Sequence, residues 1–253
     1  MFPYHDENET QRAPVVTGTL IALNVASWLF VQGAGAMLPL ARSVCELGLI
    51  PGELTGLLPP GTGFPMGEGL LCVTDPGRQV SRLFTSMFLH GSWMHLLGNM
   101  WFLWLFGNNV EDSTGRLRFL VFYLLCGLAA ALLQVAFDPA SGVPMVGASG
   151  AISGVMGGYL LLYPNVRVYA LVPIGIFLTS VALPAWTMLL YWFALQFLGG
   201  VTLLRGATGG GVAFWAHVGG FVAGLVLIKL FARPQYVAAH RAHHWHPRRV
   251  RWE

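Results

Sequence analysis

The stretch Gly147-Ala148-Ser149-Gly150-Ala151-Ile152-Ser153-Gly154 decides the fold, because it opens an uncharged segment in which glycine recurs at every fourth position. A second uncharged segment contains Ala216-His217-Val218-Gly219-Gly220, with a further glycine four residues on. Small residues at a spacing of four form a stripe along one face of a helix, and such stripes let membrane helices pack closely. The pattern predicts two closely packed helices, and their contact is expected at Gly150, Gly154, Gly220 and Gly224.

Each stripe carries one reactive residue beside it, Ser149 in the first segment and His217 in the second. A serine hydroxyl and an imidazole are a nucleophile and its base, and they must come within about 2.6–3.2 Å of each other. Only helices that nearly touch permit that distance. The alternative is ordinary helix packing, with Ser149 bonded to its own backbone. The two matched stripes favour a Ser149/His217 dyad.

The composition indicates that most of the chain lies in lipid rather than in water. Of the 253 residues, 55% are hydrophobic and 10% are charged, whereas soluble domains carry about 25% charged residues. The sequence therefore predicts an all-α polytopic membrane protein. The first twelve residues include Asp6, Glu7 and Glu9 and lack a basic region before an apolar one, so we expect them to stay attached as a polar tail rather than to form a signal peptide.

About 20 apolar residues cross the hydrocarbon core, and that length divides the uncharged stretches into six expected transmembrane helices. Their ranges are 15–38, 83–110, 119–137, 147–163, 184–202 and 211–231. Pro173 and Pro184 interrupt the long uncharged run after residue 167, so we interpret 168–182 as an interfacial or re-entrant piece. The expected organisation is a tail over 1–14, a six-helix membrane domain over 15–231 and a basic tail over 232–253.

Arginines cluster after the last span and in the short loops on the same side, at positions Arg116, Arg118, Arg167, Arg233, Arg241, Arg248, Arg249 and Arg251. The positive-inside rule then places both termini in the cytoplasm, and the loop 39–82 outside it. That loop contains Cys45 and Cys72, for which a disulfide is possible but not required. The tail histidines, His240, His243, His244 and His246, are irregularly spaced, so we favour a solvated tail over a metal site.

The second expected span carries His95 and Asn99, which lie four residues apart and therefore on one helical face. Both side chains can donate hydrogen bonds to the oxyanion that forms when a hydroxyl attacks a carbonyl. An interhelical polar clamp is the alternative for this pair. The neighbouring spans contain no carboxylate that could orient His217 from within the membrane, so two residues must suffice as the catalytic unit.

Four motifs follow one another along the chain: His95-Leu96-Leu97-Gly98-Asn99, Gly107-Asn108-Asn109-Val110-Glu111-Asp112 with Gly115, Gly147-Ala148-Ser149-Gly150-Ala151, and Ala216-His217-Val218-Gly219-Gly220 with Gly224. In these motifs the chain resembles the rhomboid family of intramembrane serine proteases. The resemblance implies a rhomboid-like bundle in which Ser149 is the nucleophile and His217 the general base. It further implies that His95, Asn99 and the Ser149 N–H form the oxyanion hole.

The resemblance also implies the reaction and its setting. Substrates would be transmembrane segments of single-pass or polytopic membrane proteins, cut within a lipid bilayer, which fits a bacterial inner membrane. No cofactor, metal or nucleic acid is implied. Two positions depart from the family: Ser153 stands where an aromatic residue often stacks on the histidine, and Ser81-Arg82 keeps only the arginine of a Trp-Arg pair.

A polar cavity that admits water is needed for hydrolysis, and a glycine-rich loop near 204–211 could cap it. Two alternatives stay open. The first is a small transporter in which His95 and His217 relay protons, although no internal repeat supports it. The second is a catalytically silent relative that binds membrane helices.

Overall fold

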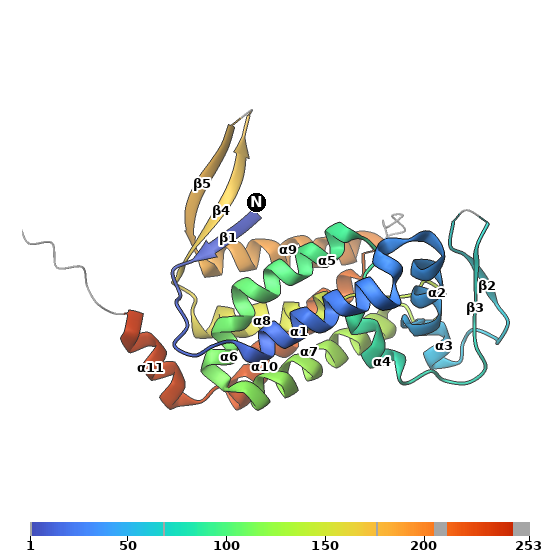
Figure 1. Cartoon of the computed structure of the whole chain (residues 1–253), viewed down its shortest axis with the longest axis horizontal. Helices are drawn as coiled ribbons and strands as arrows, with labels where there is room; N and C mark the ends of the chain where they lie inside the picture. Colours follow the sequence, from blue (N-terminus) through green and yellow to red (C-terminus); the bar gives the residue numbers. More distant parts are fainter. Residues whose placement is uncertain (1, 68, 176, 205–211, 245–253) are drawn as a thin grey trace, which may run out of the picture.

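The computed structural model describes residues 2–67, 69–175, 177–204 and 212–244. The described part is mostly helical, and its long helices run roughly parallel to one another (Figure 1). Strand β1 (Phe2–Asp6) and helix α11 (Pro234–His244) lie at one end of this bundle. The opposite end carries α2 (Met37–Leu47), α3 (Pro51–Thr55), β2 (Gly63–Pro65) and β3 (Leu71–Val73).

Helix α8 (Ser149–Leu162) forms the centre of the bundle, where it packs against α7 (Arg116–Phe137) and α10 (Phe214–Phe231). Glycine permits this contact: a Cβ on Gly224 would lie 1.9 Å from the carbonyl oxygen of Gly154, and one on Gly220 equally close to that of Gly150. The core around these helices is aromatic and fully buried, with Phe106, Phe119, Phe122, Tyr123, Tyr159 and Phe221.

The remaining long elements surround α8. Helix α1 (Val15–Ala26) continues through the π-helical segment η1 (Ser27–Val31), so it ends before residue 38. The expected span 83–110 is divided, because α4 (Arg82–Thr85) and the 3-10 segment η3 (Ser86–Phe88) end before His90. Helix α5 (Trp93–Phe102) starts anew where the Ser92 hydroxyl accepts from the N–H of His95. Helical dihedrals then carry it through η4 (Leu103–Gly107) into α6 (Asn108–Thr114).

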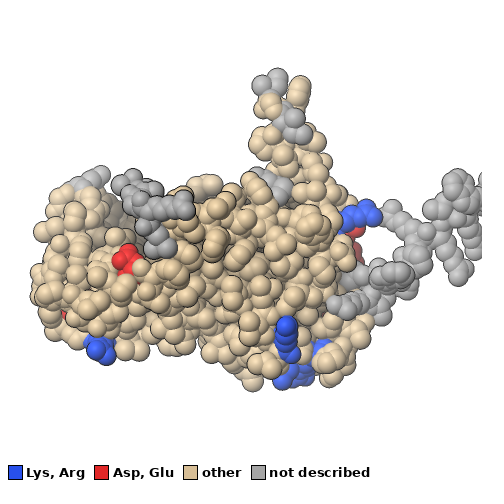
Figure 2. Space-filling model, turned by 180° about the vertical axis from the view of Figure 1, so that it is seen from behind, with Lys and Arg blue, Asp and Glu red and all other residues tan. Residues whose placement is uncertain are grey.

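Three described helices are long and apolar enough to cross a membrane, namely 116–137, 185–203 and 214–231. The second of these is most of α9 (Ala185–Leu204). Two shorter apolar helices span 15–31 and 149–162. On the face drawn in Figure 2, charged side chains stand toward the two ends and a broad uncharged belt lies between them. Such a belt is expected of surface that faces lipid. The count of six crossings stays a prediction.

The segment expected to be a re-entrant piece is a β-hairpin instead, made of β4 (Arg167–Ile174) and β5 (Phe177–Pro184). Its antiparallel pairing runs from Arg167–Pro184 to Ile174–Phe177, with Gly175 at φ +61° in the turn. Strand β1 adds to β4 and completes a three-stranded sheet in the order β1-β4-β5. The hairpin projects away from the bundle (Figure 1). Its run of β-branched and apolar residues favours strands as much as membrane insertion.

The described parts of both expected tails are folded. Residues 2–6 form β1, and Asp6 and Asn8 are buried. After α10, α11 turns back onto α6, and the imidazole of His240 becomes almost completely buried. His240 contacts Asp112 and Asn8, each at 2.7 Å. The prediction that His240 belongs to a solvated tail is therefore wrong, because these two partners remove it from water.

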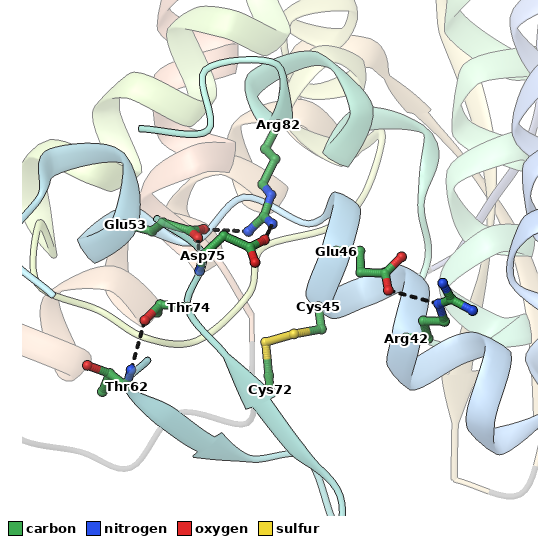
Figure 3. The surroundings of a disulfide bond; sticks show 9 residues. All are labelled: Arg42, Cys45, Glu46, Glu53, Thr62, Cys72, Thr74, Asp75 and Arg82. Carbon is green, nitrogen blue, oxygen red and sulfur yellow. Dashed lines mark hydrogen bonds and ion pairs between the residues drawn. A yellow bond between two sulfur atoms is a disulfide. The ribbon is translucent and has the colours of Figure 1, made fainter. Parts of the chain in front are cut away.

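At the opposite end of the bundle, a disulfide joins Cys45 of α2 to Cys72 of β3 (Figure 3). Beside it, the buried Arg82 guanidinium binds the carboxylates of Glu53 and Asp75. The sequence left the disulfide open. The arginine retained from the family pattern thus ties α4 to α3 and to the residues after β3, so this loop is a folded cap.

Candidate active site

Ser149 is the first residue of α8, and the turn before it determines where its hydroxyl lies. Gly147 has φ +131°, a backbone conformation that side-chain-bearing residues rarely adopt. A Cβ on Gly147 would also lie 2.8 Å from two atoms of the His95 ring. The turn is therefore tight against α5. N–H groups in the first turn of a helix have no carbonyl partner within the helix, so the Ser149 N–H belongs to a set of donors available to an anion.

The two residues expected to form a dyad are in contact. Oγ of Ser149 lies 2.8 Å from Nε2 of His217, across the close contact of α8 with α10. Both side chains are half-buried. A proton can pass directly between these atoms at that distance.

The structure brings His95 and Asn99 to the same cavity as the dyad. Nδ1 of His95 accepts the N–H of Gly91 at 3.3 Å, which leaves Nε2 as the nitrogen that carries a proton. Nδ2 of Asn99 is buried and has no hydrogen-bond partner among the described residues. An unpartnered buried amide is costly, and a charged oxygen of a bound reactant would satisfy it.

Gln196 and Trp192 of α9 reach His217 from its other side, and the sequence analysis did not identify either. Oε1 of Gln196 lies 2.7 Å from Nδ1 of His217. The Trp192 ring lies 5.7 Å from the imidazole, centroid to centroid. Ser153 instead donates its hydroxyl proton to the carbonyl oxygen of Ser149 at 2.6 Å. A lone glutamine in an otherwise apolar span, one turn from a tryptophan, is the signal that could have found them.

These side chains line a cavity of ≈ 880 Å³ that extends to Pro51 of α3, to Ser92 before α5 and to Asp138 after α7. Such a volume holds many waters and a peptide segment. The loop expected to cover it, 204–211, lies outside the described residues apart from Leu204, the last residue of α9. Within the described ranges, no cluster of three His, Cys, Asp or Glu side chains could hold a metal ion.

The sequence model of the rhomboid domain family matches residues 77–234, which include Ser149, His217, His95, Asn99 and Gln196. This chain belongs to the rhomboid family. It is 34% identical to RHOMBOID-like protein 1 of Arabidopsis thaliana over 163 residues, which cover 62% of this chain and 36% of that protein. It is 33% identical to Rhomboid-like protease 5 of Toxoplasma gondii over 154 residues, covering 58% and 16% of the two chains. Rhomboid protease GluP of Bacillus subtilis is 38% identical over 94 residues, covering 37% and 18%.

The protein is thus an integral membrane protein with a rhomboid domain, and its family includes proteases. The chain spans less than half the length of each of these rhomboid relatives. Other relatives are named as mitochondrial, including Presenilin-associated rhomboid-like protein A of Danio rerio. The bacterial inner membrane therefore stays a prediction for this rhomboid, as does the orientation of its termini.

Proposed function

We propose that this rhomboid is an intramembrane serine endopeptidase that hydrolyses peptide bonds in or near transmembrane segments of other membrane proteins. The observation that carries the proposal is the 2.8 Å contact between Oγ of Ser149 and Nε2 of His217 at the wall of a large cavity. A serine hydroxyl is a weak nucleophile until a base accepts its proton, and this contact supplies that base.

In the proposed reaction, Ser149 attacks the substrate carbonyl carbon while His217 takes the hydroxyl proton. The oxyanion accepts hydrogen bonds from the Ser149 N–H, His95 and Asn99. His217 then gives the proton to the leaving amine, and the C–N bond breaks to leave an ester on Ser149. Water repeats the two steps on the ester and releases the carboxylate. These four residues are the proposed catalytic machinery.

The setting of the reaction is part of the proposal. A six-helix bundle with both termini in the cytoplasm would put Ser149 near the opposite membrane surface, together with the cap and the mouth of the cavity. The substrates would be single-pass or polytopic membrane proteins. A helix with intact hydrogen bonds shields its own carbonyls, so cleavage would require the substrate helix to unwind locally.

A serine-directed fluorophosphonate probe on the purified protein in detergent tests the proposal. We expect covalent labelling of the wild type and none of Ser149→Ala. Cleavage of a tagged single-pass substrate in proteoliposomes should disappear in Ser149→Ala and in His217→Ala, although both stay folded. Wild-type protein that neither labels nor cleaves would support a silent relative that only binds membrane helices. Proton transport that survives Ser149→Ala but stops in His217→Ala would support the transporter alternative.

A further inference from the structure

We propose that Gln196 of α9 is the positioning residue of the active site, which holds the His217 imidazole in the tautomer that can accept the Ser149 proton. The inference rests on the proposed function. It assigns to a neutral amide the position that a carboxylate occupies beside the histidine of soluble serine proteases.

The two hydrogen bonds of His217 define its protonation pattern. A neutral imidazole has one N–H and one lone pair, so the nitrogen that faces Ser149 must carry the lone pair if it is to act as a base. Nδ1 then carries the proton, and it lies 2.7 Å from Oε1 of Gln196. The amide oxygen accepts that N–H. When Nε2 takes the serine proton, Oε1 still faces Nδ1 and its dipole stabilises the imidazolium.

An amide has a second state that a carboxylate lacks. If the Gln196 side chain turned by half a revolution, its NH₂ would face Nδ1, and His217 would have to carry its proton on Nε2, where it cannot act as a base. The orientation of a single amide thus separates a competent dyad from an incompetent one. Glutamate at this position can only accept, so it fixes the competent tautomer.

Apart from its contact with Ser149 of α8, the His217 ring is held by side chains of α9. Trp192 stands one turn before Gln196, and its ring contacts both the imidazole and, at 6.3 Å, Phe221. The Ser153 hydroxyl donates its hydrogen bond to a carbonyl of its own helix rather than to the His217 ring. In the most apolar stretch of each helix, 17% of α9 is buried inside the protein, whereas 44% of α7 and 44% of α10 are buried. The base is therefore oriented by the most weakly packed of the three long apolar helices, and any displacement of α9 removes both contacts together.

Three variants and one control test this role. Gln196→Leu keeps a side chain of similar size but removes the oxygen that accepts the Nδ1–H of His217. We expect kcat to fall roughly 10- to 100-fold and KM to change little. This loss is smaller than the ~10⁴-fold loss seen when a triad carboxylate is neutralised. Gln196→Asn is one methylene too short and should lose a similar amount. Gln196→Glu should restore kcat to within a few-fold. Leu198→Ala, on the exposed surface of the same helix, should behave as the wild type.

The pH profile separates positioning from packing. The other titratable side chains that line the cavity among the described residues are His95 and Asp138, and all variants keep them. A carboxylate beside His217 favours the imidazolium, so in Gln196→Glu the acidic limb of kcat/KM should move to higher pH. An unchanged limb in Gln196→Glu would show that the side chain at this position does not face the imidazole.

A spectroscopic readout does not depend on turnover. Among the eight histidines, the ring ¹⁵N signals of His217 are assigned by their loss in His217→Ala. They should report the Nδ1–H tautomer in the wild type and in Ser149→Ala, and a mixture of tautomers in Gln196→Leu. Unchanged signals in Gln196→Leu, or turnover within twofold of wild type, would overturn the proposal for Gln196. Absence of labelling and cleavage in the wild type would instead remove the proposed function, and the ¹⁵N signals would still decide the tautomer.

Discussion

Gly220 and Gly224 bring His217, the proposed base, to Ser149, because each faces a backbone carbonyl of α8 where only a hydrogen atom fits. Gly220 is three residues after His217, and its neighbour Gly150 directly follows Ser149. A separation of α8 from α10 by the width of one methyl group would stretch the 2.8 Å contact between Oγ and Nε2 well beyond hydrogen-bond distance.

We therefore expect Gly220→Ala to lower both the labelling of Ser149 and the thermal stability in detergent. The clash is with a backbone oxygen, which no rotamer change can relieve, and overpacking typically costs about 1–3 kcal/mol. Gly18→Ala in α1 is the matched control, because a Cβ there has no atom within 4 Å and alanine favours a helix by up to ~1 kcal/mol. Equal melting temperatures for the two variants would show that the close approach is not required.

Asn99→Ala should reduce turnover roughly 10- to 1,000-fold while the melting temperature stays close to that of the wild type. Nδ2 of Asn99 has no partner in the described part of the protein, so its removal breaks no bond in the resting state but deletes a donor to the oxyanion. Steady-state kinetics with the tagged substrate and thermal unfolding give the two numbers. Loss of activity in proportion to loss of stability would favour the interhelical clamp.

At the scale of elements, the cap is held by one arginine that spans three segments. Arg82 at the start of α4 binds Glu53 of α3 and, at 2.5 Å, Asp75 after β3, while Glu53 also accepts the N–H of Asp75 at 2.6 Å (Figure 3). Arg82 and Glu53 are 4% and 3% exposed. A carboxylate so deeply buried depends on its cation.

Arg82→Met should destabilise the cap by about 3–5 kcal/mol, because it leaves the Glu53 carboxylate buried and unpaired. Arg42→Met is the control: Arg42 and Glu46 form an exposed pair on α2, and such pairs contribute about 0–1 kcal/mol. The measurement is thermal unfolding together with limited proteolysis of the loop 39–82. A cap equally resistant to protease in both variants would show that the disulfide alone holds it.

Some elements of the fold can be predicted from the sequence more closely than others. The helices α7, α8 and α10 were predicted within about three residues, because charged residues, proline and glycine mark their ends. The β4–β5 hairpin was missed, because both of its faces are apolar and no alternation distinguished it from a membrane segment. Its neighbour β1 lies more than 150 residues away in the chain.

The same limit applies to the site. Local sequence patterns suffice to select four candidate residues, namely Ser149, His217, His95 and Asn99. The contribution of Gln196 depends on how α9 rotates against α10, which local sequence does not encode.

At the scale of the whole molecule, the residues of β1 and those just after it meet helices α6, α8 and α11 at one end of the bundle. Asp6 accepts from the Tyr159 hydroxyl at 2.6 Å and from Nδ2 of Asn109 at 3.1 Å. Asn8 joins Tyr159 to His240, whose other ring nitrogen binds Asp112. Burial raises the pKa of Asp6 from 3.8 to about 7, although the hydrogen bond from Tyr159 acts in the opposite direction.

This raised pKa gives stability a defined pH dependence. The contribution of Asp6 is fully present below about pH 4 and is lost as the pH rises through about 7, where the buried carboxyl must ionise. Asp112 has a lowered pKa: burial raises it, but the hydrogen bonds from His240 and the Gln11 N–H and the charge of Arg12 outweigh that effect. Its contribution is lost only as the pH falls through that lowered pKa, so it stays constant between pH 5 and 8.

Asp6→Asn should therefore raise the melting temperature more at pH 8 than at pH 5. One pKa unit corresponds to about 1.4 kcal/mol, so the gain can reach a few kcal/mol. Glu7→Gln is the control, because Glu7 lies next in the chain and is exposed. A wild-type melting temperature that does not fall between pH 5 and 8 would contradict the buried position of Asp6.

The contacts of Asp6 and Asn8 with much later residues also determine the order in which this region can assemble during synthesis. A ribosome makes Asp6 and Asn8 first, yet Tyr159 follows Asp6 by 153 residues and His240 follows Asn8 by 232. At about 5–20 residues per second, the first segment waits many seconds in water before its partners exist. Helix α11 docks after the helices before it have been made, and it then withdraws Asn8 and Asp112 from solvent. A nascent chain that stalls before residue 234 lacks α11, so it leaves Asn8 and Asp112 without their contacts to His240.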